Sequence, residues 1–138
     1  MSGNALWQFG WQDSFAIGDD AIDSQHRAFF TGAEQIRLAL QSDEPKAAIL
    51  DYCAGFLADL RIHFRDEEQL MARLDVAELP EHRKEHARLL VATEEAYHEL
   101  DRASCLIDCL LQTRALLEQL AEHIARNDQA IRSYLPGR

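Results

Sequence analysis

Two pairs of side chains in this sequence have the types and the spacing of metal ligands. His63 and Glu67 stand four residues apart, and so do His82 and His86. In an α-helix, four residues bring the chain back to within about 40° of the same direction, so both members of such a pair can reach one bound ion. A single pair of this kind proves little, because a solvated His–Glu contact explains it equally well.

Two further histidines strengthen the metal interpretation. Five of the six histidines fall on the apolar faces of the expected helices: His26, His63, His82, His86 and His123. An imidazole buried there without a partner would be costly, and metal ligation would remove that cost. His98 lies about 120° around the helix from His86 and is expected on the surface. The alternative is a set of satisfied core histidines beside ordinary surface carboxylates.

The donor types narrow the choice of metal. Imidazole suits zinc, copper, nickel and iron, and the lack of nearby thiolates excludes the usual structural zinc sets. The three cysteines, Cys53, Cys105 and Cys109, form no CxxC pair, and we expect them to be small buried apolar residues without a role. Ferritin-like di-iron sites use Glu-x-x-His motifs from two helices. The one such motif here, Glu95 to His98, lies off the inferred face.

These side chains need helices to position them, and the apolar residues recur with helical spacing throughout. We predict an all-α fold, an antiparallel up-down four-helix bundle, with helices at about 20–41, 44–74, 80–101 and 104–135. The expected N-terminal caps are Ser42 or Asp43 for the second helix and Asp101 or Ser104 for the fourth. Residues 1–138 then form one domain.

The N-terminal segment, residues 1–19, is too aromatic for a free tail. It contains Trp7, Trp11 and Phe15, and we expect it to pack across the bundle and cover part of it.

Composition excludes some partners. The chain has 138 residues, 47% of them hydrophobic, and a formal net charge of −10, with a pI near 4.9. Without clustered Lys and Arg, we expect no nucleic-acid partner. No stretch of membrane-spanning length and no signal peptide is evident, so we expect no membrane partner and a cytoplasmic location.

The sequence resembles a known family, the bacterial hemerythrins, over nearly its whole length. The residues that carry the resemblance are Trp11, Phe15, Ile17, Gly18, Ile22, Asp23, Gln25, His26, His63, Phe64, Glu67, Glu68, Met71, His82, His86, His123, Ile124 and Asp128. His82 follows Met71 at an interval of eleven positions, as in the family.

The resemblance implies a cofactor of two iron ions, bridged by an oxo or hydroxo group. The residues that match the ligands of one iron are His82, His86 and His123, those of the other iron are His26 and His63, and Glu67 and Asp128 match the bridging ligands. Asp128 comes from the resemblance alone, because it lies about 140° from His123 on an ideal helix. Spacing would favour Asn127.

The resemblance also implies a function, the reversible binding of dioxygen at a five-coordinate iron. The protein would serve as an oxygen carrier or as the oxygen- or redox-sensing domain of a signalling protein, with a C-terminal output domain if the chain is a fragment. No catalytic residue is expected. The expected lining of the oxygen pocket is Phe29, Phe64, Gln119, Leu120 and Ile124.

Two other functions stay open. One is a di-iron enzyme, such as a peroxidase or an oxygen or nitric-oxide reductase, and the other is a metal-storage bundle. At three positions where the family usually has aromatic residues, this chain has other side chains: Gln119, Asp59 and Val76. A polar Gln119 in the pocket would speed autoxidation, which suits a sensor or a reductively driven enzyme better than an oxygen store.

Overall fold

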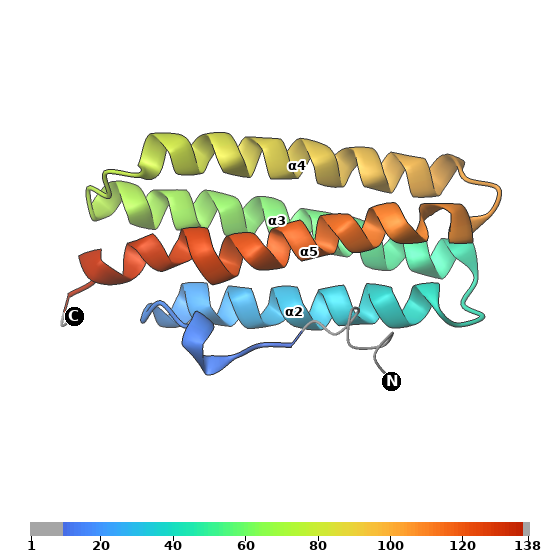
Figure 1. Ribbon diagram of the computed structural model, residues 1–138, viewed down its shortest axis with the longest axis horizontal. Helices are drawn as coiled ribbons and strands as arrows, with labels where there is room; N and C mark the ends of the chain where they lie inside the picture. The colour runs from blue at the N-terminus through green and yellow to red at the C-terminus, as the bar shows by residue number, and fades with distance from the viewer. Residues whose placement is uncertain (1–9, 137–138) are drawn as a thin grey trace.

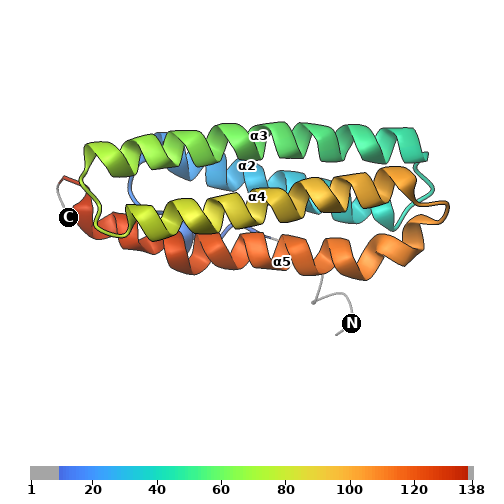
Figure 2. The ribbon, with the colours of Figure 1, turned by 90° about the horizontal axis from the view of Figure 1, so that it is seen from above.

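Four long antiparallel helices lie side by side in the computed structural model, which describes residues 10–136 apart from the side chains of 107 and 108 (Figures 1 and 2). The long helices are α2 (Asp20–Leu40), α3 (Lys46–Arg73), α4 (Leu79–Arg102) and α5 (Leu110–Arg126). Short 3-10 helices are η1 (Asp13–Phe15), η2 (Leu106–Cys109) and η3 (Asn127–Tyr134), the last continuing directly from α5. No strand occurs within residues 10–136. The predicted all-α four-helix bundle is therefore confirmed.

The start of α3 differs from the expectation. Pro45 is the N-cap residue of this helix, and no side chain caps it. The hydroxyl of Ser42 instead donates to the carbonyl of Ala39, at the end of the preceding helix. The predicted cap by Ser42 or Asp43 is wrong, because Ser42 closes the end of α2 instead and Pro45 is the N-cap of α3.

The start of α5 is also later than expected. Helix α4 continues to Arg102, so Asp101 lies in its last turn, and α5 begins only at Leu110, with Cys109 as an N-cap that offers no side-chain hydrogen bond. The predicted cap by Asp101 or Ser104 is therefore wrong. Cys105 lies before η2 in the connection and is exposed, contrary to the expected burial, whereas Cys109 is buried.

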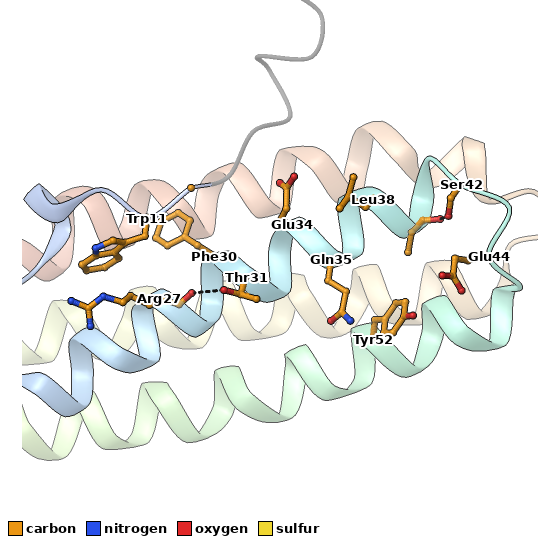
Figure 3. A pocket seen from close by; sticks show the side chains of 12 residues that line it. Trp11, Arg27, Phe30, Thr31, Glu34, Gln35, Leu38, Ser42, Glu44 and Tyr52 are labelled. Atoms are coloured by element: carbon orange, nitrogen blue, oxygen red, sulfur yellow. Dashed lines mark hydrogen bonds between the residues drawn. The ribbon is translucent and has the colours of Figure 1, made fainter.

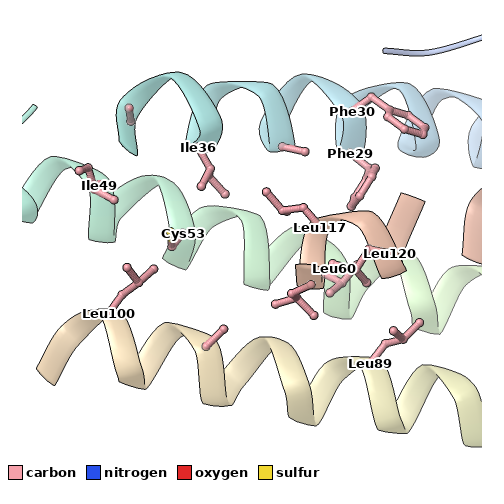
Figure 4. Packing of buried hydrophobic residues seen from close by; sticks show 14 of the residues in the cluster. Phe29, Phe30, Ile36, Ile49, Cys53, Leu60, Leu89, Leu100, Leu117 and Leu120 are labelled. Carbon is pink, nitrogen blue, oxygen red and sulfur yellow. The ribbon is translucent and has the colours of Figure 1, made fainter. Parts of the chain in front are cut away.

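The main apolar core fills the half of the bundle where α2 joins α3 and α4 joins α5. Figure 4 shows Ile36 of α2, Ile49 and Cys53 of α3, Leu100 of α4 and Leu117 of α5 pointing into the same space. Burial raises the pKa of the Cys53 thiol to about 11, so this thiol is an inert packing group. A second apolar cluster closes the opposite end of the bundle and includes Ile17, Ile22, Met71 and Ile131.

The N-terminal segment from residue 10 lies against α2 and η3. The ring of Phe15 stacks on Phe30 with centroids 5.4 Å apart. Gln129 donates to the carbonyl of Phe15 at 2.9 Å, and Arg132 donates to the carbonyls of Ser14 and Ala16. Trp7 lies outside the described residues.

An open groove runs along the outer face of α2, with Trp11 near one end and Glu44 near the other (Figure 3). Its volume is about 880 Å³. None of the described helices has the length and apolar character needed to cross a membrane.

Candidate metal centre

Seven ionisable side chains from all four long helices and η3 meet inside the bundle. They come from the end where α2 and α4 begin and α3 and α5 finish (Figure 1). Each is buried, with at most 6% of its surface exposed: His26, His63, Glu67, His82, His86, His123 and Asp128. The structure thus brings together every residue that was predicted as a metal ligand.

Five of these residues form one group around His82. The Nε2 atom of His82 lies 2.8 Å from Glu67 Oε1 and 2.9 Å from Asp128 Oδ1. Glu67 Oε1 is also 3.0 Å from Nε2 of His86, and Asp128 Oδ1 is 3.0 Å from Nε2 of His123. The Nε2 atoms of His86 and His123 are 3.1 Å apart.

The second group forms around His26 and uses the other oxygen of each carboxylate. His26 Nε2 lies 3.1 Å from Glu67 Oε2 and 3.0 Å from Asp128 Oδ2. The Nε2 atom of His63 is 3.1 Å from that of His26 and 3.4 Å from Glu67 Oε2. Glu67 and Asp128 therefore each offer one oxygen to each group.

The arrangement of these atoms fits metal ions. Both oxygens of Asp128 are buried and form no hydrogen bond, although ring nitrogens lie about 3 Å away. The ring nitrogens thus converge on Asp128 without donating to it, whereas Glu67 is hydrogen-bonded to His26 and His82. Within each group, the candidate donor atoms all lie within 4.8 Å of one another. Two cations, one in each group, would satisfy donors that the protein alone leaves unpaired.

The pKa values show how strongly the charges interact when no ion is bound. Burial alone would lower the pKa of His26, but the carboxylates of Asp128 and Glu67 raise it to about 9. The same opposing causes raise the pKa of His82 to about 10. Burial lowers the pKa of His63 to about 4. The centre therefore holds protons beside its carboxylates, and bound cations would take the place of those protons.

Two polar side chains outside the seven orient ligand histidines. The Nδ1 atom of His63 lies 2.7 Å from Gln25 Oε1, and the Gln25 amide nitrogen donates to Asp66 at 2.9 Å. Because Asp66 fixes which end of the amide faces the ring, His63 must donate from Nδ1, which leaves the Nε2 lone pair free for an ion. The sequence prediction did not assign this role to Gln25, although its place next to His26 was a usable signal.

Glu68 orients the ring of His86 by a hydrogen bond to its Nδ1 atom. His86 Nδ1 donates to Glu68 Oε2 at 2.7 Å, and Arg83 lies 3.5 Å from the other oxygen of Glu68. This partner is an anion, whereas the partner of His63 is a neutral amide.

Asp128 reaches the centre because the helix changes its course just before it. Regular α-helix ends at Arg126, whose backbone angles are φ −118° and ψ −60°, and η3 follows. The angle of an ideal helix does not apply across this junction. Asn127, which spacing favoured, is exposed, and Asp128 is fully buried.

Apolar side chains surround the seven residues. Phe64 stacks on the ring of His86, with centroids 3.9 Å apart and planes 9° from parallel. Three other predicted lining residues, Phe29, Leu120 and Ile124, are buried. The structure does not bring Gln119 into this group, because its side chain is exposed and its Oε1 accepts a hydrogen bond from Arg88 at 3.4 Å.

The remaining residues singled out in the sequence lie elsewhere. His98 is exposed, as predicted for a surface residue. Asp59 is exposed on α3, and Val76 is buried in the second apolar cluster. In the part of the chain that the structure describes, neither ligand group contains a thiol.

Comparison with known proteins agrees with this geometry. The family model for the hemerythrin HHE cation binding domain matches residues 17–135. Myohemerythrin of Riftia pachyptila is 33% identical over 95 residues, which cover 68% of this chain and 72% of that protein. Bacteriohemerythrin of Ralstonia nicotianae is 29% identical over 128 residues, 93% of this chain and 89% of that protein. No solved structure gives a significant match. The chain therefore belongs to the hemerythrin family, whose domain binds a di-iron centre.

Proposed function

We propose that this domain binds dioxygen reversibly at a di-iron centre held by the seven buried residues, as an oxygen carrier or as an oxygen- or redox-sensing domain. The observation that carries the proposal is the sharing of both carboxylates. Glu67 and Asp128 each present one oxygen to the group of His82 and the other to the group of His26. A pair of ions held close together needs ligands of this kind.

The two groups differ in the number of donors. One iron would take three imidazoles and two carboxylate oxygens, from His82, His86, His123, Glu67 and Asp128. The other would take only two imidazoles, from His26 and His63, together with the two remaining carboxylate oxygens. The side of His26 and His63 therefore leaves more room for an exogenous ligand, and we assign dioxygen to that side.

When bound, the di-iron pair supplies an open coordination position and the two electrons that dioxygen accepts. The protein contributes a donor set with five neutral imidazoles, which stabilises the ferric state less than a carboxylate-rich set would and so favours release of the ligand. Gln25 and Glu68 hold two of the rings in place from outside.

The surroundings favour binding over chemical turnover. Phe29, Phe64, Leu120 and Ile124 are buried apolar side chains that would limit the access of water to the centre. Among the buried carboxylates and imidazoles of the described residues, only Asp23 stands outside the seven. Its two oxygens accept from the backbone N–H groups of Ile17 and Gly18, so it is engaged in holding the N-terminal segment. An additional buried acid or base for proton transfer is thus not evident in this part of the chain.

The test is a cycle of visible spectra on the purified protein, recorded in air, after anaerobic reduction and after oxygen is readmitted, with iron counted per chain. We expect two irons and a charge-transfer spectrum that bleaches and returns through a distinct oxygenated form. Direct return to the oxidised spectrum, with no intermediate form, would contradict reversible binding. A protein that cannot be loaded with iron would contradict the whole assignment.

His63→Ala and His98→Ala form a matched pair for this test. His63→Ala should remove the oxygenated form, because it deletes one of the two imidazoles on the proposed oxygen side. His98→Ala changes an exposed histidine on α4 and should leave the cycle unchanged.

A further inference from the structure

A pocket of about 500 Å³ opens between α2 and α3 and extends inward to Gln25 and His63. This volume lies in the range of small-molecule sites, about 300–1,000 Å³, and it is far larger than dioxygen requires. Gln35 of α2 and Tyr52 of α3 border the pocket, and Figure 3 shows Gln35 pointing towards Tyr52.

Two glycines, one from each helix, line the pocket. Gly55 lies in the middle of α3, and a Cβ atom added to it would meet nothing within 4 Å. Gly32 lies in the middle of α2, where a Cβ atom would approach Phe56 Cδ1 to 3.1 Å. A glycine inside a helix costs about 0.5–1 kcal/mol relative to alanine. Packing does not require that cost at Gly55, where an added side chain would extend into open space.

The inner surface of the pocket is aromatic. Phe29 and Phe56 contact each other with centroids 5.3 Å apart, and Tyr52 lines the same space. Aromatic rings that line a pocket attract both planar aromatic ligands and cations, the latter through the negative electrostatic potential of the ring face.

Two carboxylates stand at the rim. Asp51 and Asp59 lie four residues before and four residues after Gly55, on the same side of α3, and both are exposed and line the pocket. No ion pair between described residues includes either of them, and the described lining contains neither Lys nor Arg. The local charge therefore favours a cation and opposes an anion, as does the net charge of −10.

We propose that this pocket binds a small aromatic cation, whose ring contacts Phe29, Phe56 and Tyr52 and whose charge lies between Asp51 and Asp59. The site is separate from the seven metal ligands except at its inner end, where the ligand would contact the outer side of the Gln25–His63 hydrogen bond. It does not depend on the binding of dioxygen.

Calorimetric titration of the iron-loaded protein with benzamidinium tests the proposal. We expect saturable binding of one benzamidinium per chain. Benzyl alcohol, which has a similar ring without the charge, should bind at least tenfold more weakly, and benzoate should not bind measurably. Equal affinity for benzamidinium and benzyl alcohol would overturn the assignment to a cation, and no saturable binding of benzamidinium would overturn the site.

Gly55→Leu locates the binding, because the added side chain would occupy the open space. We expect this variant to keep two irons and lose benzamidinium binding. Ala58→Leu adds a similar side chain at an exposed position of α3 that does not line the pocket, and it should bind as the unchanged protein does. Binding that survives Gly55→Leu would place the ligand elsewhere and overturn the proposal.

A charge-matched pair of double variants tests the role of the carboxylates. D51N with D59N should weaken benzamidinium binding roughly fivefold to tenfold, in keeping with two exposed charge contacts. E95Q with E122Q changes the net charge equally at exposed sites outside the pocket and should have little effect. An equal loss in both double variants would show that only net charge matters and would overturn the specific contact.

Discussion

The two halves of the bundle are made from the same four helices, but among the described residues only one half buries carboxylates and imidazoles. One half is filled by apolar residues such as Ile36, Leu100 and Leu117 (Figure 4). Its two buried hydroxyl residues are Thr93 and Thr113, and the Thr93 hydroxyl donates to the carbonyl of Leu89 at 2.7 Å. The other half buries five imidazoles and two carboxylates in contact with one another.

This difference predicts which half of the bundle is stable without bound metal. Apolar packing in the first half is favourable without any ligand, by about 25 cal/mol per Å² of apolar surface removed from water. In the second half, Glu67 and Asp128 are completely buried, and without metal they are compensated only by protonated His26 and His82, whose own burial is unfavourable. The apolar half should therefore support the fold, and the polar half should depend on its metal.

Removal of iron should have the largest effect on the difference in stability between the two halves. Ligands that bind only the folded state stabilise it by about 4 kcal/mol at a thousandfold excess over the Kd, so the metal-free protein should unfold at clearly lower denaturant concentration. Hydrogen exchange should increase mainly around His26, Glu67, His82 and His123, with the region around Leu100 still protected. Equal loss of protection in both halves would show that they unfold as one unit.

Substitution of one shared carboxylate should break the polar half specifically. Glu67→Gln keeps the shape of the side chain but removes the charge that faces both ligand groups, so we expect fewer than two irons per chain by metal analysis. Glu68→Gln is the matched control, because the neighbouring residue undergoes the same change and its amide oxygen can still accept from His86. Two irons in Glu67→Gln would contradict the role of Glu67 as a shared ligand.

The apolar half should respond in the opposite way. Leu100 is 2% exposed, and Leu100→Ala should lower the free energy of unfolding by about 2–5 kcal/mol through lost burial and the cavity left behind. Iron content should stay at two per chain. Leu111→Ala, at a residue that is 71% exposed, should change stability by less than about 0.5 kcal/mol. Loss of iron in Leu100→Ala would mean that the halves are tightly coupled.

The same contrast explains what could be predicted from the sequence. Apolar periodicity indicates the four helices and their buried faces, because each turn repeats the signal. The pairs His63 with Glu67 and His82 with His86 are visible because both members lie in one regular helix. Asp128 was not visible in this way, since it follows the junction at Arg126 where regular α-helix ends.

Helix ends and exposed polar residues were harder to predict. The chain around Ser42 and Ser104 offers several polar residues that could cap a helix, and local spacing does not show at which residue the helix begins. Gln119 stands four residues before His123, so it was expected beside the centre, but Arg88 on the neighbouring helix holds its amide outside. Such a contact between helices depends on how they pack, which a single sequence does not show.

The outer hydrogen bonds of the polar half should have an intermediate effect. Gln25→Ala removes the partner of His63 Nδ1, and loss of such partners typically lowers metal affinity by about 10- to 100-fold. Competition with a chelator would measure the change. Unchanged affinity in Gln25→Ala would show that packing alone orients the ring.

The smallest effect should come from the two glycines that line the pocket between α2 and α3. Gly55→Ala should raise the free energy of unfolding by about 0.5–1 kcal/mol, because alanine is the better helix former and its Cβ meets open space. Gly32→Ala has the same helical benefit, but its Cβ would lie 3.1 Å from Phe56 Cδ1, so its gain should be smaller or negative. Denaturant unfolding of the two iron-loaded variants measures the difference. If Gly55→Ala were instead the more destabilising change, the space beside Gly55 would not be open in solution, and the pocket between α2 and α3 would lose its physical basis.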